Sequence, residues 1–295
     1  MNAMPHDAPA DANADTGADA QAARVRREAD AAADAAALAA ARSSAFAIPL
    51  RTLSWGDPLR WLALGWSDYR RAPGLGLFYG IVFIVMGWSI EKVFEHAPPY
   101  TLALSGGFLL MGPFLCLGIY RVSQRLEQGV TPGFADSVLA WESKIGQLGI
   151  FGFVLLVLEM LWARATLVVF AVTFDGMPDF KGSLLALLDP DNITFIVAWF
   201  ALGAIFATLI FAFTVVSMPM ILDRKTDAIT AALTSFRLVL GQPGVMFFWG
   251  LLIAVITFSA MLPWFIGLLV TGPLIGHASW HAYRAAVVDE TAPKS

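Results

Sequence analysis

Glu159 and Arg164 lie in the middle of an apolar stretch long enough to cross a membrane. Ionisable groups at that depth are costly, so they usually face the interior of a helical bundle and mark a site or a pathway. A spacing of five residues separates them by about 140° around a helix, so each needs another partner. We expect that partner among Thr208, Thr214 and Ser217 of the next apolar stretch. Without any function, the two residues would form a polar clasp between helices, or Arg164 would extend toward the outer surface.

His277 and His281 form a second candidate site, together with Tyr283, near the inner end of the last apolar stretch. Histidines four residues apart share one helical face, and such spacing can hold a metal ion. Two ligands do not make a metal site, however, and no matching Cys, His or Glu motif lies nearby. We therefore expect no bound metal or cofactor. His281 and Tyr283 are also well placed to meet lipid headgroups.

No catalytic residue is predicted, because the chain has no Walker loop, nucleophile elbow, HExxH motif or dinucleotide fingerprint. Its single cysteine, Cys116, lies within an apolar run. It can form no internal disulfide and is expected to fill space in the core.

The composition of the chain indicates that these candidate residues belong to a membrane protein. Apolar residues make up 58% of the chain and charged residues 14%, and the mean hydropathy is +0.67. Soluble proteins have about 45–50% apolar and roughly a quarter charged residues. Apolar runs of about twenty residues, enough for a bilayer core, recur after residue 73. They predict six spans, at 74–93, 101–120, 146–174, 193–221, 244–262 and 263–283.

An internal repeat organises these spans. Pro73 to Gly80 reads PGLGLFYG, and Pro243 to Gly250 reads PGVMFFWG. We expect Gly80 and Gly250 to be equivalent positions of close helix packing. The following spans each carry a Gly-Pro pair, with Pro113 and Pro273 at equivalent positions. These prolines are predicted to kink their helices, and broken helices at matching positions are also a weak sign of a binding site.

An amphipathic segment precedes each pair of spans, at 58–71, 131–145 and 226–240. In the first, one helical face gathers Leu59, Trp61, Leu62, Trp66 and Tyr69, and the other gathers Arg60, Ser67, Asp68 and Arg71. Such a helix is typical of the membrane interface. The sequence thus predicts an all-α membrane protein with six transmembrane helices, arranged as three repeated hairpins, each preceded by an interfacial amphipathic helix. The repeats cover about 57–128, 129–224 and 225–288.

The basic residues give the orientation. With the N-terminus inside, the predicted inner segments hold 16 of the 19 Lys and Arg residues. This bias predicts that both termini are cytoplasmic. The outer segment Asp175–Asp191 is acidic. Aromatic residues near the predicted interfaces fit aromatic belts: Trp61, Trp66, Trp88, Tyr100, Tyr120, Trp264 and Trp280.

The two ends differ from the membrane domain, which we place at 46–288. Residues 1–45 are rich in Ala and Asp and have no aromatic residue before Phe46. This composition predicts a disordered, acidic cytoplasmic tail with a helical patch at Gln21–Ala41. Residues 289–295 form a short cytoplasmic tail.

The chain resembles a bacterial family known as domain of unknown function 2189. The resemblance rests on PLRWL, GWSD and RAPG within 58–74, FYG at 78–80, WARA at 162–165, and GPLIGHASWHAYR at 272–284. It spans about 50–285 and implies an integral membrane protein with no particular activity. Some relatives carry a cytochrome c oxidase subunit I label. That label does not suit this chain, whose four histidines cannot supply axial ligands from several helices to two haems and a copper.

Two functions remain open from the sequence. We favour a structural or interaction role without catalysis, in which the basic cytoplasmic face meets anionic lipid, an unknown protein partner or a second copy. The alternative is a small-solute or ion transporter that uses Glu159 and Arg164. No nucleic-acid partner is expected. A water-accessible cavity at Glu159 would favour transport, and a packed centre would favour the structural role.

Overall fold

The computed structural model describes residues 12–97, 101–173, 193–224 and 226–288. It divides into two compact units, Met1–Ser44 and Ala45–Ser295. The described residues form helices and no strand, apart from one isolated bridge between Leu50 and Val287. The acidic outer segment predicted at Asp175–Asp191, the C-terminal tail and Tyr100 lie outside the described residues.

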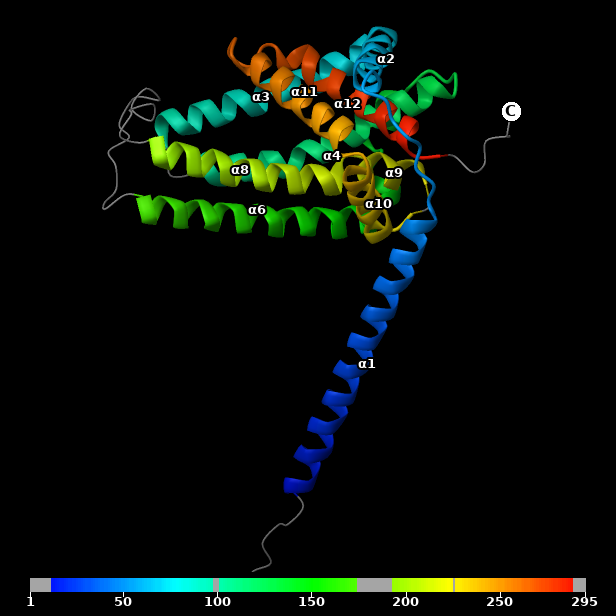
Figure 1. Ribbon diagram of the computed structural model, residues 1–295, viewed down its shortest axis with the longest axis vertical. Helices are drawn as coiled ribbons and strands as arrows, with labels where there is room; N and C mark the ends of the chain where they lie inside the picture. The colour runs from blue at the N-terminus through cyan, green and yellow to red at the C-terminus, as the bar shows by residue number, and fades with distance from the viewer. Residues whose placement is uncertain (1–11, 98–100, 174–192, 225, 289–295) are drawn as a thin grey trace, which may run out of the picture. The chain divides into compact units, whose positions relative to one another are not determined.

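The N-terminal segment is helical where the composition predicted disorder. Helix α1 spans Ala12–Ala47 (Figure 1), so the predicted helical patch forms and is longer than expected. Alanine has the highest helix propensity of all residues, and an exposed ion pair between Arg24 and Glu28, 3.0 Å apart, adds a small contribution one turn on. Low hydrophobicity therefore did not prevent helix formation here.

The segment predicted as the first repeat forms three helices. Helix α2 spans Asp57–Arg71, α3 spans Pro73–His96 and α4 spans Thr101–Glu127. Asp57 is the first residue of α2, and its carboxylate accepts a hydrogen bond from the Ser54 amide at 2.7 Å. Pro113 lies inside α4.

The middle segment departs furthest from the repeat. The amphipathic helix predicted at 131–145 reduces to the five-residue α5, Phe134–Val138, and a short 3₁₀ turn, η2, Glu142–Lys144. Helix α6 then spans Ile145–Thr173. The fourth predicted span is broken at residues 215–216 into α8, Ile193–Thr214, and α9, Ser217–Asp223. Helices α6 and α8 pack side by side (Figure 1).

The last segment again begins with a helix before a Pro-Gly pair. Helix α10 spans Ala228–Gly241, α11 spans Pro243–Met261 and α12 spans Leu268–Ala286. Asp227 caps α10 by accepting a hydrogen bond from the Thr230 amide at 2.9 Å. The last helix starts five residues later than predicted. Residues between α11 and α12 form turns, in which Trp264 and Phe265 have positive φ angles of 48° and 62°.

Among the residues that the structure describes, four helical segments are long and apolar enough to cross a membrane: Pro73–His96, Phe134–Val169, Ile193–Asp223 and Pro243–Met261. They contain α3, α6, α8 and α11. Helices α4 and α12, which the sequence predicted as the second and sixth spans, are not among them. Both carry several polar residues in their C-terminal halves.

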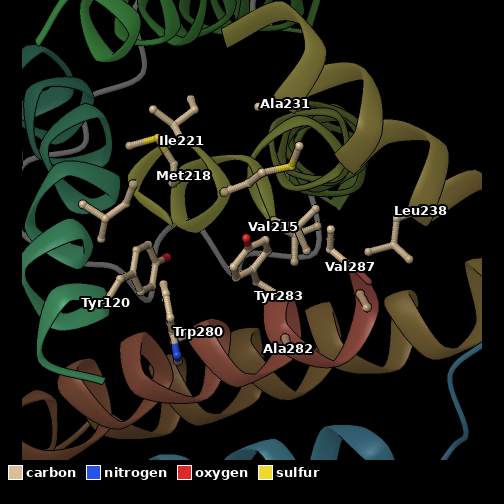
Figure 2. Close-up of a cluster of buried hydrophobic side chains, with 14 of the residues drawn as sticks. Tyr120, Val215, Met218, Ile221, Ala231, Leu238, Trp280, Ala282, Tyr283 and Val287 are labelled. Atoms are coloured by element: carbon tan, nitrogen blue, oxygen red, sulfur yellow. The ribbon is translucent and has the colours of Figure 1, made fainter. Parts of the chain in front are cut away.

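Helix α12 is the centre of the Ala45–Ser295 unit, since it packs against α2, α3, α4, α9 and α11. The main core gathers around α9 and the C-terminal half of α12 (Figure 2). Trp280 and Tyr283 are fully buried there. Trp61, Tyr120 and Trp280 are therefore core residues, and their predicted place in an aromatic belt is wrong. Residues Trp66, Trp88 and Trp264 are exposed.

The two predicted packing glycines are not equivalent. A Cβ atom on Gly80 would overlap the backbone carbonyl of Leu269 in α12, so only glycine permits this approach. A Cβ on Gly250 would meet the ring of Phe211 at 3.6 Å, an ordinary contact. The backbones of α3 and α12 touch, whereas α11 meets α8 through a side chain.

The exposed faces of α2 and α10 include large apolar side chains, and α2 does not keep the predicted separation into an apolar and a polar face. Trp61 and Asp68 of α2 are buried, while Leu59 and Trp66 are 56% and 41% exposed. In α10, likewise, Thr234 is buried and Leu240 is exposed. In both helices some polar side chains face the protein and some large apolar ones face away from it, while Trp61 and Leu238 are apolar and buried.

Candidate functional site

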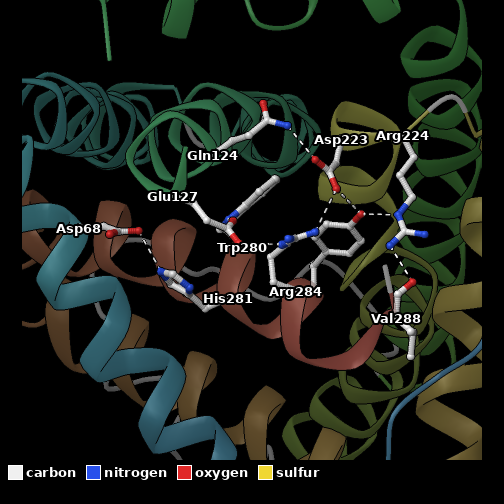
Figure 3. Close-up of polar contacts among 10 residues, drawn as sticks. Asp68, Gln124, Glu127, Asp223, Arg224, Trp280, His281, Arg284 and Val288 are labelled. Carbon is white, nitrogen blue, oxygen red and sulfur yellow. Dashed lines mark hydrogen bonds and ion pairs between the residues drawn. The ribbon is translucent and has the colours of Figure 1, made fainter. Parts of the chain in front are cut away.

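Two regions contain buried polar side chains that come from several helices. The first surrounds the C-terminal half of α12, and we call it the α12 network (Figure 3). It consists of Asp68 of α2, Ser123, Gln124 and Glu127 of α4, Asp223 and Arg224 at the end of α9, and His277, Trp280, His281, Tyr283 and Arg284 of α12.

The two histidines of the network have different partners. His277 shares a hydrogen bond with the Ser123 hydroxyl through Nδ1 at 2.7 Å. His281 contacts an Asp68 carboxylate oxygen through Nε2 at 2.8 Å. They face different helices, so their spacing serves to join α12 to α4 and to α2. Among the residues that the structure describes, no cluster of three metal-binding side chains occurs.

The Asp68 carboxylate is well suited to this pairing. Burial raises its pKa, but the hydrogen bond and the charge of His281 lower it, with the net result that the pKa lies below its ordinary value. Arg71, one turn on, approaches the same carboxylate at 3.7 Å. The sequence placed Asp68 on a solvated face, and the structure corrects this because α2 turns that face toward α12.

Tyr283 makes hydrogen bonds to two charged residues of the network. Its hydroxyl donates to Asp223 at 2.7 Å and accepts from Arg224 Nε at 2.9 Å. Arg224 also donates to the Val288 carbonyl at 2.9 Å. Tyr283 is fully buried, so it does not meet lipid headgroups as the sequence suggested.

Glu127 and Asp223 complete the network from either side of α12. Glu127 accepts hydrogen bonds from Trp280 Nε1 and from Arg284 Nε, both at 3.0 Å. Asp223 accepts another from Gln124 Nε2 at 2.8 Å. The carboxylates of Glu127 and Asp223 therefore each accept hydrogen bonds from two side chains. These bonds hold the ends of α4, α9 and α12 together.

The second region is a cavity of about 440 Å³ that reaches Glu159, and we call it the Glu159 cavity. Its walls come from α4, α6, α8, α9, α11 and α12, and they are mostly apolar. The lining includes Pro113, Cys116, Tyr120, Glu159, Trp162, Gly203, Phe206, Phe211, Thr214, Val215, Met218 and Ser279. Pro113 and the break between α8 and α9 both border this space, so two helix irregularities face it.

Glu159 is buried, with 9% of its surface exposed. In the part of the chain that the structure describes, the Glu159 carboxylate has no hydrogen-bond or ion-pair partner. The three hydroxyls expected to pair with it bond elsewhere: Thr208 donates to Ala204, Thr214 to Phe211 and Ser217 to Phe213, in each case to a backbone carbonyl. The predicted clasp between the third and fourth spans does not form.

Arg164 lies apart from this cavity. Its side chain is exposed, and it is not part of the cavity lining. Of the two ionisable residues of this helix, Glu159 is buried and Arg164 is exposed. A second unpartnered polar atom is present in the cavity wall instead: the buried Trp162 Nε1 has no hydrogen-bond partner among the described residues.

The polar residues of the α12 network other than the two histidines and Tyr283 escaped the sequence analysis. One pattern in the sequence could have revealed part of the α12 network. Tyr120, Ser123, Gln124 and Glu127, at the end of a predicted span and just beyond it, recur at three- and four-residue intervals, which places them on one helical face if the helix continues. A polar stripe on a helix in a membrane protein implies polar partners on neighbouring helices.

Comparison with known proteins supports the membrane assignment. Residues 101–223 match the model of the family described as "Predicted integral membrane protein (DUF2189)", so the resemblance to this family is confirmed over that range. The matched range contains WARA at 162–165, while the other motifs that suggested the resemblance lie outside it. No curated protein and no solved structure matches the chain.

Proposed function

We propose that this protein is a bacterial inner-membrane transporter of a small solute, with six spans, cytoplasmic termini, and a solute site in the Glu159 cavity. One observation carries the proposal: a buried carboxylate without a partner borders a cavity of about 440 Å³. Ligand sites are usually largely apolar cavities of about 300–1,000 Å³ with a few polar groups. A purely structural residue would be expected to have a hydrogen-bond partner, because a buried carboxyl without one is costly.

The helix irregularities around the cavity support transport in particular. The break at residues 215–216 and Pro113 lie in its walls. In transporters built from repeats, binding sites are commonly formed by interrupted helices, and such interruptions allow one part of the bundle to move against another. The centre beside Glu159 is also not fully packed, and a packed centre is what the structural role would have favoured.

The arrangement of the helix ends supports six spans. The α12 network gathers the C-terminal ends of α4, α9 and α12, together with α2. Lys144, just before α6, joins the same region by donating to the Arg224 carbonyl at 2.8 Å. At the far end of α3, Trp88 donates to the Trp264 carbonyl between α11 and α12 at 2.9 Å. The ends of α4, α9 and α12 and the start of α6 therefore lie together, as the six-span arrangement requires of these ends.

Helix α2 is suited to contact with anionic lipid on that side. Leu59 and Trp66 are exposed, and Arg60 and Arg70 are exposed beside them. Apolar side chains with flanking arginines favour the interface of a membrane that carries anionic lipid. We therefore keep lipid as the expected partner of this surface.

A structural or interaction role is the second candidate, and the α12 network favours it. A fully bonded polar cluster joins four helices, as a rigid scaffold requires. In that case the Glu159 cavity would be a packing defect filled by lipid chains.

Charge removal at Glu159 separates the two candidates. Glu159→Gln retains the shape of the side chain and removes its charge, so it should abolish the growth or uptake phenotype in a protein that remains folded. Gly203→Phe should do the same by filling the cavity, because a Cβ at Gly203 meets no atom within 4 Å. The exposed acid Glu142 gives the control, Glu142→Gln. Thermal stability in detergent is measured for each variant, and full activity of a folded Glu159→Gln protein would rule out transport through this residue.

A further inference from the structure

The chemistry of the Glu159 cavity limits the charge of its solute. The lining contains one acidic side chain, Glu159, and no Lys, Arg or His among the described residues. Arg164, the only basic residue of the same helix, is exposed and outside the lining. An anionic solute would therefore meet one like charge and no counter-ion, which makes an anion the least favourable occupant.

A carboxylate in such surroundings requires a positive partner. An isolated ionised group in an apolar environment is unfavourable by many kcal/mol unless it takes up a proton or pairs with a cation. Glu159 is nine-tenths buried and has no partner among the described residues. A cation that enters the cavity would supply the missing charge, and a proton would take its place when the cation leaves.

The walls favour an organic cation over a metal ion. Ca²⁺ binds six to eight oxygen ligands and Mg²⁺ needs six in octahedral geometry, whereas most of this lining is apolar. The rings of Tyr120, Trp162 and Phe206 belong to the wall. Aromatic faces attract ammonium groups, and do so more strongly when water is excluded.

We infer that the solute of the Glu159 cavity is an organic monocation, with a protonated or quaternary nitrogen that pairs with Glu159 and an apolar body that fills the remaining space. This inference rests on the proposed function and specifies its substrate class.

Three probes of nearly equal shape and different charge test the substrate class. Tryptamine is a cation at neutral pH, tryptophol is its uncharged analogue, and indoleacetate is an anion. Binding of each is measured by equilibrium dialysis against the purified full chain in detergent, with protein-free detergent as the partition control. The first pair of variants is Glu159→Gln and its exposed control Glu142→Gln. The second pair is Gly203→Phe and its control Gly146→Phe. Both glycines have open space at Cβ, and Gly146 lies outside the cavity lining.

The wild type and Glu142→Gln should bind tryptamine roughly tenfold more tightly than tryptophol, since a desolvated ammonium gains at least that factor from a carboxylate and an aromatic face. Glu159→Gln should bring the two affinities to parity, and Gly203→Phe should abolish both while Gly146→Phe retains them. Equal binding of tryptamine and tryptophol in the wild type, lost in Gly203→Phe, would overturn the cation class and leave a solute site in the cavity standing. The inference would be overturned if folded protein showed no saturable binding of any of the three probes, or if it preferred indoleacetate. The transport proposal is then decided separately, by the phenotype of Glu159→Gln.

Discussion

The hydroxyl of Tyr283 offers the sharpest test of the α12 network. Tyr283→Phe removes one oxygen atom and leaves the ring, so it opens no large cavity in a fully buried position. That oxygen donates to Asp223 at 2.7 Å and accepts from Arg224 at 2.9 Å. Hydrogen bonds to charged groups each contribute about 1.5–3 kcal/mol.

The remaining contacts reduce the expected loss. Asp223 retains the hydrogen bond from Gln124 at 2.8 Å, and Arg224 retains the Val288 carbonyl at 2.9 Å. Neither charge is left without a partner, so we expect a loss of about 2 kcal/mol in place of the sum of both bonds. For a chain of this size, that corresponds to a decrease in Tm of about 4–8 °C.

Thermal unfolding in detergent measures the effect, with Tyr69→Phe as the matched control. The Tyr69 ring stacks on Trp66 in α2, and its hydroxyl has no hydrogen-bond partner among the described residues. The control should therefore shift Tm by less than about 2 °C, as surface substitutions do. Equal shifts for the two variants would refute the view that the α12 network stabilises the fold.

Three further predictions follow from particular contacts. Gly80→Ala should destabilise by about 1–3 kcal/mol because its Cβ overlaps a backbone carbonyl, while Gly250→Ala should be neutral; equal denaturation midpoints would contradict this. Asp68→Asn should lower Tm at pH 7. Since the folded pKa of Asp68 lies below its ordinary value, the difference from wild type should shrink below about pH 4, and a gap independent of pH would exclude the charge. Reporter fusions should score outside at Asp179 and inside at Thr226, and an outside signal at Thr226 would overturn six spans.

Most helices could be predicted from the sequence because long apolar runs and Pro-Gly breaks are local signals of where a helix forms and where it begins. Helices α3, α6 and α11 begin within one residue of their predicted starts. The late start of α12 follows from Trp264 and Phe265, whose left-handed backbone conformation has no signal in residue type, because neither is Gly or Asn. The short α5 likewise shows that an amphipathic period does not ensure a complete helix.

The direction in which each helical face turns could not be derived from one sequence. A period of 3.6 residues groups side chains on a face, and it does not say whether that face meets lipid or protein. In α2 the apolar residues Leu59 and Trp66 are exposed, and Asp68 is buried against His281. In soluble proteins the opposite arrangement is the rule. The predicted partners of Glu159 failed for a related reason, since Thr208 and Thr214 bond to carbonyls within α8 and Ser217 bonds to the Phe213 carbonyl of α8.

The position of α12 explains why it lacks the hydropathy of a typical span. A helix that faces lipid needs apolar side chains around its circumference, whereas one surrounded by other helices can carry polar groups if each finds a partner. His277, Tyr283 and Arg284 all find partners on α4 or α9. The backbone of α3 approaches α12 directly at Gly80. Low hydropathy and central burial in α12 therefore have one cause: its neighbours are protein helices, which supply the hydrogen bonds that lipid cannot.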